Sequence, residues 1–155
     1  MKILVIKFRH IGDVLLTNPL IRNLKLNFPQ AKIDVVINKE CEDVLKYNPN
    51  INKIFTYNRK EIKKLWFFKK IIKEIKFLNK FKNYDMVINT TEGDRGAFIA
   101  KFSKAKIKIG YLPKKNILLK NAFNIILPKP ILIRHMIENN LDVIRVLNKK
   151  IFDKK

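Results

Sequence analysis

The first 26 residues constrain the fold most, because an apolar run, a short polar loop and a helical pattern follow one another there. The run Ile3-Leu4-Val5-Ile6 has the length and β-branched content of a strand buried on both faces, as the central strands of parallel sheets are. Apolar residues recur at helical spacing from Val14 to Leu24, so the segment is predicted to be strand, loop and helix. The loop follows the carboxyl end of the strand, which is where open α/β sheets form their sites.

This loop carries a cation, a titratable ring and a carboxylate: Arg9, His10 and Asp13. Gly12 permits a tight turn and an aspartate can cap a helix, so capping alone is one interpretation of Asp13. The convergence of three such groups on one sheet edge supports a second interpretation, a catalytic or binding site. The spacing by itself leaves both interpretations open.

Strand-like and helical segments alternate along the rest of the chain. Strands are expected at residues 32–37, 53–57, 84–89, 106–109 and 123–127, and helices at 39–47, 59–82, 97–102 and from about 131. This alternation predicts an α/β fold, a Rossmann-like three-layer domain with a mainly parallel sheet. The domain is placed in residues 1–150, and residues 151–155 are expected to be a frayed basic tail.

Nucleotide-binding motifs are missing from the sequence. The loop after the first strand has one glycine where the dinucleotide motif needs three, and no GxxxxGK[ST] motif occurs. The domain is therefore not expected to hold a nucleotide alone. No Asp-x-Asp pair or His/Cys cluster offers a metal site, and Cys41, expected to be half-buried, has no second thiol, so neither a metal nor a cofactor is predicted.

The formal net charge of +21 favours a phosphate-bearing partner: nucleic acid, an anionic membrane surface or a phosphorylated glycolipid. The AT-rich codons of lysine, asparagine and isoleucine provide a second explanation for the charge, genomic bias. Nucleic acid is the less expected partner, because the aromatic residues fall within apolar patterns instead of alternating with basic ones. Apolar stretches end well before 18 residues, so a cytoplasmic location is expected.

The segment 59–82 is predicted to be one amphipathic helix with lysines on its outer face. Its ordinary interpretation is a helix packed on the sheet with solvated lysines. A second interpretation uses the apolar bulk of Trp66 and Phe67 beside the lysines as a contact with a membrane interface or a lipid-linked substrate.

The sequence resembles the lipopolysaccharide heptosyltransferases of glycosyltransferase family 9, most of all the heptosyltransferase III branch. The first and most specific motif extends from Lys2 to Lys7 and continues from His10 to Pro19. Weaker matches follow in the same order as in the family: residues 85–89, Gly93-Asp94-Arg95, Lys108-Ile109-Gly110-Tyr111, and His135 with Leu141.

This resemblance implies a GT-B glycosyltransferase with two Rossmann-like domains, of which this chain is the N-terminal, acceptor-side half and the C-terminal donor-binding domain is absent. The implied reaction is inverting transfer of heptose from ADP-heptose to the lipopolysaccharide inner core, at the cytoplasmic face of the inner membrane. The match gives Asp13 the role of general base. Acceptor contacts are expected at Lys7, Arg9, His10, Lys64, Asp94 and Arg95.

Without a donor-binding domain, the chain alone is expected to have little transferase activity. The alternative function is a basic binding module for nucleic acid or an anionic membrane surface, which the net charge alone would attract.

Overall fold

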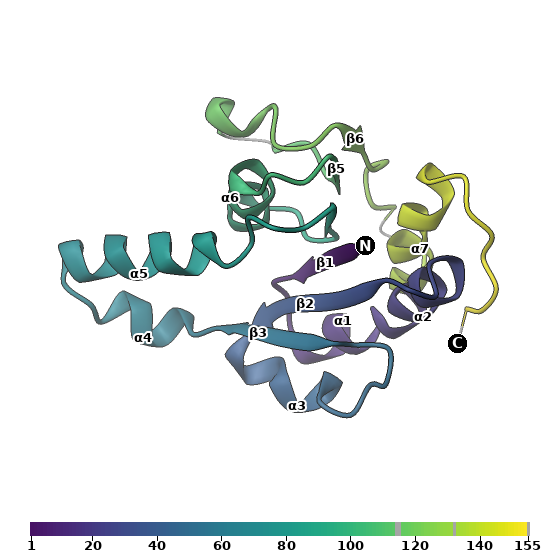
Figure 1. Ribbon diagram of the computed structural model, residues 1–155, viewed down its shortest axis with the longest axis horizontal. Coiled ribbons are helices and arrows are strands. Elements are labelled where there is room, and N and C mark those ends of the chain that lie inside the picture. Colours follow the sequence, from purple (N-terminus) through teal and green to yellow (C-terminus); the bar gives the residue numbers. More distant parts are fainter. Residues whose placement is uncertain (114–115, 132, 155) are drawn as a thin grey trace.

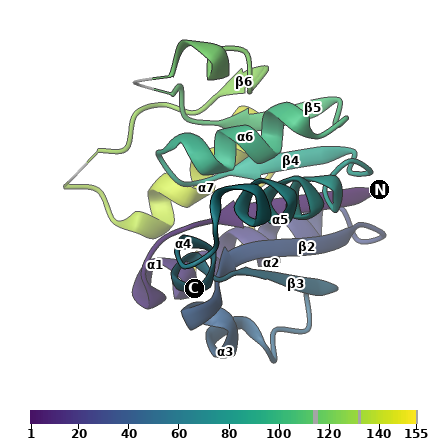
Figure 2. The same cartoon turned by 90° about the vertical axis from the view of Figure 1, so that its left-hand side faces the viewer.

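Six parallel strands form one sheet in the part of the chain that this computed structural model describes, residues 1–113, 116–131 and 133–154. The strands lie in the order β3-β2-β1-β4-β5-β6, from bottom to top in Figure 2. Every pairing between neighbours is parallel, which confirms the predicted α/β fold class. The strands are β1 (Lys2–Lys7), β2 (Lys32–Asn38), β3 (Lys53–Tyr57), β4 (Met86–Asn89), β5 (Ile107–Gly110) and β6 (Ile125–Ile126).

Helices cover both faces of this sheet (Figure 1). One face packs against α2 (Asn18–Asn27), α3 (Glu42–Leu45) and α7 (Met136–Val146), and the other against α6 (Asp94–Phe102) and the end of α5 (Phe67–Asn79). The remaining elements are α1 (Ile11–Leu15), η1 (Lys39–Cys41), α4 (Arg59–Lys63) and η2 (Ile117–Leu119).

The central strand β1 explains why the first apolar run has no polar interruption. Ile3 and Val5 belong to the core on the α2 and α7 face, whereas Leu4 and Ile6 belong to the core on the α6 face. All four side chains are fully buried. Successive residues of a strand point to opposite faces, so a strand covered on both sides must be apolar at every position.

Two predicted helices are each interrupted in the structure. The first is divided into α1 and α2, with Pro19 in the first turn of α2, because proline has no N–H to donate to the carbonyl of Leu15 in a continuous helix. The segment predicted as one helix over 59–82 is divided into α4 and α5 by residues 64–66. Trp66 is the N-cap of α5 and has an extended backbone.

Phe152 and Asp153, in the segment that was expected to fray, contact α2. The Asn23 side chain donates a hydrogen bond to the carbonyl oxygen of Asp153 at 2.6 Å and accepts one from the backbone N–H of Phe152 at 2.7 Å. Arg22 and Asp153 form an ion pair of 2.5 Å. Cys41, expected to be half-buried, ends η1 and is fully buried in the core.

Gly96 permits the close approach of α6 to the end of β4, and Gly96→Ala is expected to destabilise the fold by about 1–3 kcal/mol. A Cβ atom at Gly96 would lie 2.4 Å from Oδ1 of Asn89. The Asn89 amide cannot move freely, because it is buried and bonded to both the carbonyl oxygen and the N–H of Thr91. The measurement is the free energy of unfolding in urea.

The matched control is Gly12→Ala, since a Cβ atom at Gly12 in α1 meets no atom within 4 Å. This substitution is expected to leave stability unchanged or to raise it by up to about 1 kcal/mol. Equal unfolding midpoints for the two variants would contradict the proposed contact.

Candidate functional site

The polar loops that follow β1 and β4 lie side by side. β1 pairs with β2 on one side and with β4 on the other, so the strand order reverses between β1 and β4. In open parallel sheets, ligands bind in the crevice outside the carboxyl ends of the strands at this reversal. The backbone N–H of Phe8 donates a hydrogen bond to Oγ1 of Thr91 at 3.0 Å, which ties the two loops together. Two segments far apart in sequence therefore form one site.

A cavity of about 140 Å³ opens at this junction. Its walls come from the ends of three neighbouring strands and from the segment that leads into α7. The charged and polar residues that line it are Lys7, Arg9, Thr90, Glu92, Tyr111, Arg134 and Asn139. The cations at its wall make the cavity suited to an anionic ligand.

Lys7 is buried at the wall of this cavity and joins two of the segments beside it. Its side chain is 1% exposed, and Nζ donates hydrogen bonds to the carbonyl oxygen of Thr90 at 3.1 Å and to Oδ1 of Asn140 at 3.0 Å. Asn140 in turn donates to the carbonyl oxygen of Leu16 at 2.8 Å. Burial lowers the pKa of the Lys7 amine to about 8; the Asp13 carboxylate opposes this shift and Arg9 adds to it. Contact between Lys7 and an acceptor stays a prediction.

Asp13 is not the N-cap of its helix. His10 occupies the N-cap position of α1 and makes no side-chain capping bond, while Asp13 lies in the first turn. The Asp13 side chain is half-buried, and no hydrogen bond to its carboxylate is made by residues within the described ranges. The capping interpretation is therefore wrong in its literal form. The Asp13 carboxylate oxygens are thus available to accept a hydrogen bond from a ligand hydroxyl.

Arg9 and His10 are the exposed cation and ring of the same loop. The backbone of Arg9 is fixed from β2 and η1, since its carbonyl oxygen accepts hydrogen bonds from Nδ2 of Asn38 at 3.1 Å and from Sγ of Cys41 at 3.5 Å. The main chain of Arg9 is thus anchored while its side chain lines the cavity.

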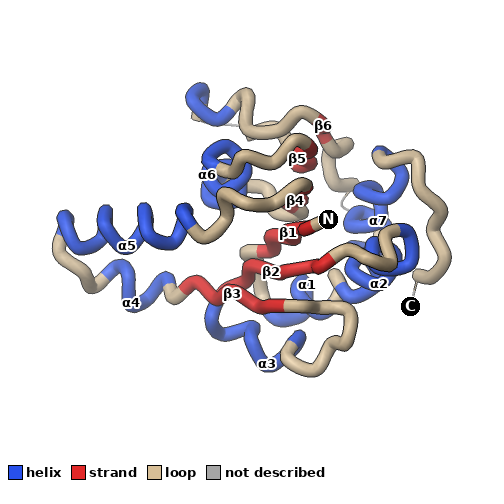
Figure 3. Tube along the Cα trace, viewed as in Figure 1, coloured by secondary structure: helices blue, strands red, loops and turns tan. Residues whose placement is uncertain are grey.

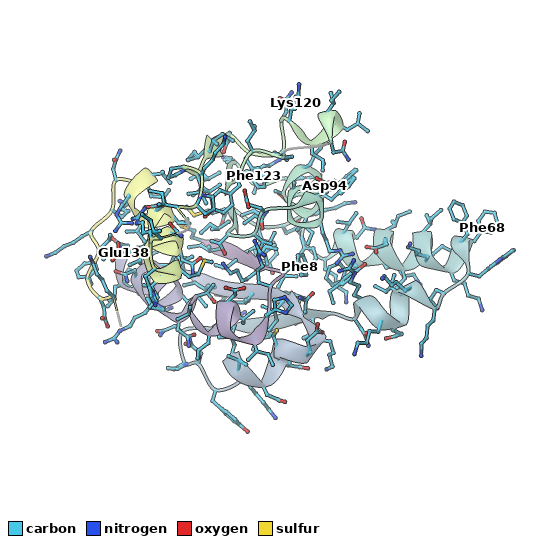
Figure 4. The ribbon with its side chains drawn as sticks, turned by 180° about the vertical axis from the view of Figure 1, so that it is seen from behind. Phe8, Phe68, Asp94, Lys120, Phe123 and Glu138 are labelled. Carbon is cyan, nitrogen blue, oxygen red and sulfur yellow. The ribbon has the colours of Figure 1, made fainter. Side chains whose placement is uncertain are left out.

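The guanidinium group of Arg95 lies against two aromatic rings. Its guanidinium carbon lies 4.0 Å from the ring centroid of Tyr57 and 5.6 Å from that of Phe8, which are cation–π distances. Arg95 and Asp94 also line a largely apolar groove of about 410 Å³ between α5 and α6. Figure 4 shows Phe8 and Asp94 in the central part of the molecule. Arg95 is thus joined to the loop after β1 through Phe8, whereas Asp94 borders the neighbouring groove.

Tyr57 and Phe8 were not predicted as site residues, because both belong to apolar patterns in the sequence. The Tyr57 hydroxyl donates a hydrogen bond to Glu74 of α5. Burial raises the pKa of Tyr57 to about 12, and this hydrogen bond adds to the shift. The strand expected at 53–57 already ends at Tyr57, but only the pairing of β3 with β2 shows that this end lies beside the site.

Arg134 fixes the α7 side of the cavity. Its two terminal nitrogens donate to the two carboxylate oxygens of Asp142, each at 2.9 Å. Arg145 bonds to Asp142 as well, at 2.6 Å. Hydrogen bonds from Lys154 and Arg145 lower the pKa of Glu138 to about 2. The charge of Arg134 is thus paired with a carboxylate of α7, whereas Arg9 forms no ion pair with the residues that the structure describes.

Of the predicted acceptor residues, Lys7 and Arg9 line the cavity, Asp94 and Arg95 line the neighbouring groove, and His10 lines neither. Lys64 also lies away from both. It lies in the link between α4 and α5, at the end of the helix pair that projects from the sheet in Figure 3. Among the described residues, no group of three or more His, Cys, Asp or Glu side chains is arranged to hold a metal ion. None of the helices within those ranges is long and apolar enough to cross a bilayer.

Comparison with proteins of known sequence identifies heptosyltransferases. The chain is 34% identical over 141 residues to lipopolysaccharide heptosyltransferase 3 of Escherichia coli (strain K12), a match that covers 90% of this chain and 40% of the relative. A second lipopolysaccharide heptosyltransferase 3 of Escherichia coli is 31% identical over 138 residues. No family model matches the sequence.

By sequence and by fold, the chain matches the N-terminal half of the lipopolysaccharide heptosyltransferases. The resemblance inferred from the motifs is confirmed, and the chain spans about 40% of the length of the curated relatives it matches. The curated relatives that it matches at 31–34% identity are lipopolysaccharide heptosyltransferases, which are glycosyltransferases.

Solved structures show the same fold. E. coli heptosyltransferase WaaC with ADP-2-deoxy-2-fluoro heptose matches with a TM-score of 0.80 and 20% identity, over 97% of this chain and 50% of that one. The glycosyl transferase family 9 protein from Veillonella parvula DSM 2008 matches with a TM-score of 0.76 and 24% identity, over 99% of this chain and 42% of that one. These likenesses confirm the GT-B half-architecture that the resemblance implied.

The buried amine of Lys7 predicts an unusual dependence of stability on pH. Its pKa is lower in the folded chain, about 8, than its ordinary value of 10.5, so the unfolded chain binds more protons between these two pH values. Stability therefore rises with pH in this window. From pH 8 to pH 10 the free energy of unfolding is expected to rise by about 2 kcal/mol more in the wild type than in Lys7→Met.

The control is Lys32→Met at the exposed start of β2, which should keep the wild-type rise. Urea denaturation at pH 8, 9 and 10 measures all three proteins. Parallel pH profiles for the wild type and Lys7→Met would show that burial of Lys7 does not disfavour its charged form.

Proposed function

We propose that this chain is the acceptor-binding domain of a heptosyltransferase that transfers heptose from ADP-heptose to a hydroxyl of the lipopolysaccharide inner core. One observation carries the proposal: the Asp13 carboxylate, which accepts no hydrogen bond from the described residues, lies in the first turn of α1, directly after the loop that meets the β4 loop beside a cationic cavity. The names of the relatives support the substrate class, since they are lipopolysaccharide heptosyltransferases and one neighbour holds an ADP-heptose analogue.

Asp13 acts in this proposal as the general base. It takes the proton of the acceptor hydroxyl while that oxygen forms a bond to the anomeric carbon of heptose, and the bond from this carbon to the ADP oxygen breaks. Attack from the face opposite the leaving group inverts the anomeric configuration, so a single carboxylate suffices and no covalent enzyme intermediate forms. The Asp13 side chain is half-buried and interacts electrostatically with the Lys7 amine, which lines the cavity.

Arg9 is the principal acceptor contact in this proposal, with His10 beside it. The Arg9 side chain lines the cavity, and its main chain is held by Asn38 and Cys41, so its guanidinium can bind a phosphate of the acceptor without reordering the loop. Lys7 holds the loop after β1 in place through its hydrogen bonds to Thr90 and Asn140. Lys64 contacts only those acceptor phosphates that lie outside the cavity, and the donor is bound by a second domain of the kind found in the longer relatives.

Asp13→Asn tests the catalytic role when the chain is joined to the C-terminal half of E. coli lipopolysaccharide heptosyltransferase 3. Turnover of ADP-heptose with a core acceptor is expected to fall about 10²- to 10⁴-fold, while the acceptor dissociation constant changes less than about threefold. The chain without the second half is expected to show little turnover. The control is Asp43→Asn, an exposed carboxylate of α3. Equal losses in acceptor affinity and turnover would return Asp13 to a structural role.

Arg9→Gln tests acceptor binding by the chain alone. Binding of the phosphorylated, deacylated inner-core oligosaccharide, measured by calorimetry, is expected to weaken about tenfold because one charge-assisted hydrogen bond is lost. Arg59→Gln, which removes an exposed cation at the start of α4, is the matched control and should bind as the wild type does. Equal weakening in both variants would indicate a general attraction between charges instead of a contact at the cavity.

A further inference from the structure

The pair of helices α4 and α5, residues 59–79 with the link at 64–66, extends beyond the sheet and has an uncovered face. We call it the α4–α5 hairpin. None of the residues in α5 is buried. Figure 1 shows the hairpin projecting from the side of the molecule opposite α2 and α7, and Figure 4 places Phe68 at its far end. A helix with a strong apolar pattern but no buried residue has an unsatisfied hydrophobic face.

Three aromatic side chains form the tip of this hairpin. Trp66, Phe67 and Phe68 are 73%, 64% and 62% exposed. The Phe68 ring lies edge-on to both neighbours, with centroid distances of 5.5 Å to Trp66 and 5.6 Å to Phe67. Ile72 and Ile75 continue the exposed apolar surface along α5. The rings thus contact one another and leave most of their surface in water.

Cations surround this apolar surface. Residues 59–79 contain eight Lys and Arg residues and only two acidic ones. Both acidic side chains are engaged within the fold, Glu61 with Lys73 and Glu74 with the Tyr57 hydroxyl. Lys63, Lys69 and Lys70 are exposed beside the tip.

We propose that the α4–α5 hairpin docks the chain on an anionic lipid bilayer, with the aromatic tip in the headgroup region and the flanking lysines on lipid phosphates. Trp and Phe side chains favour this region, and lysines can lay their methylene groups on apolar surface while keeping the ammonium near phosphate. The combination of exposed apolar rings with a dense positive charge matches an anionic bilayer, which offers hydrocarbon and phosphate side by side. A polyanion without hydrocarbon would leave Phe67 and Phe68 in water.

The end of α5 nearest the sheet packs against residues of the sheet edge, so the hairpin and the sheet are joined. The Phe77 ring of α5 packs against Tyr57 and Phe81 with centroid distances of 5.2 Å and 5.0 Å. Tyr57 also lies against Arg95 at the start of α6. The hairpin is therefore fixed to the strand ends, so docking would orient the whole sheet with respect to the bilayer. This inference goes beyond the proposed function, because lipid binding needs neither donor nor acceptor.

Trp66 makes the test specific, because it is the single tryptophan of the chain. The full chain is mixed with vesicles of phosphatidylglycerol and phosphatidylethanolamine, or with phosphatidylcholine vesicles at the same salt. With the anionic vesicles, Trp66 emission is expected to shift to shorter wavelength and to be quenched by lipids brominated in their acyl chains. With phosphatidylcholine, the shift is expected to be much weaker, since the electrostatic attraction is missing.

Matched variants separate the tip from the rest of the surface. Phe67→Ser with Phe68→Ser is expected to weaken partitioning into anionic vesicles at least about tenfold, because two exposed rings no longer leave water. Ile117→Ser with Leu118→Ser removes two similarly exposed apolar side chains in η2 and should bind as the wild type does. Sedimentation with vesicles measures the bound fraction, and Trp66 stays in place as the probe.

A second pair of variants tests the charges. Lys63→Glu, Lys69→Glu and Lys70→Glu together are expected to abolish the preference for anionic vesicles. Lys82→Glu, Lys104→Glu and Lys106→Glu change the net charge equally, at exposed positions on the segments that precede β4 and β5, and should retain it.

Several results would overturn the proposal. The first is an absence of any blue shift or acyl-chain quenching with anionic vesicles, and the second is an equal loss of binding in hairpin and control variants. The third is a Trp66 shift that grows with protein concentration without lipid, which would assign the tip to a second copy of the chain. The fourth is an equal Trp66 response to an oligonucleotide or heparin, which would assign it to a polyanion.

Discussion

The buried amine of Lys7 joins the parts of the molecule on which the site depends. It lies at the end of the central strand, where it meets the carbonyl oxygen of Thr90 after β4 and the side chain of Asn140 in α7. A lysine in such a position loses hydration, which is the first cause of its lowered pKa. The hydrogen bonds offset part of this cost, and they hold the loop with Arg9 and His10, which leads to Asp13 in α1, beside the loop after β4.

The protein has two surfaces with different chemistry, the cavity beside Lys7 and the α4–α5 hairpin. The cavity at the strand reversal has fixed cations and a carboxylate in reach, and thus suits a small anionic ligand that must be held in one orientation. The α4–α5 hairpin combines exposed rings with exposed lysines, and thus suits an extended and fluid surface. Tyr57 contacts both, through Arg95 on the side of the site and through Phe77 on the side of the hairpin.

The sequence predicted the sheet well because a buried strand is a local run of apolar residues. β1 and β3 were recognisable from runs of apolar and β-branched residues, and the loops after β1 and β4 stood out by their polar composition. Local pattern could not show that Pro19 divides the first helical segment or that Trp66 starts a new helix. Nor could it show that Asn140 binds Lys7 or that Arg95 lies on Tyr57, since those contacts join residues distant in sequence.

The hydrogen bonds of Lys7 to Thr90 and Asn140 have a consequence for the order in which the chain folds. Lys7 and Thr90 are 83 residues apart, and Lys7 and Asn140 are 133 apart. Each long-range closure costs chain entropy before its contacts form. Strand β1 can pair with β2 early, but its last residue finds both of its partners only after β4 has entered the sheet and α7 has packed on α2. The site around Lys7 is therefore complete only when β4 and α7 are both in place.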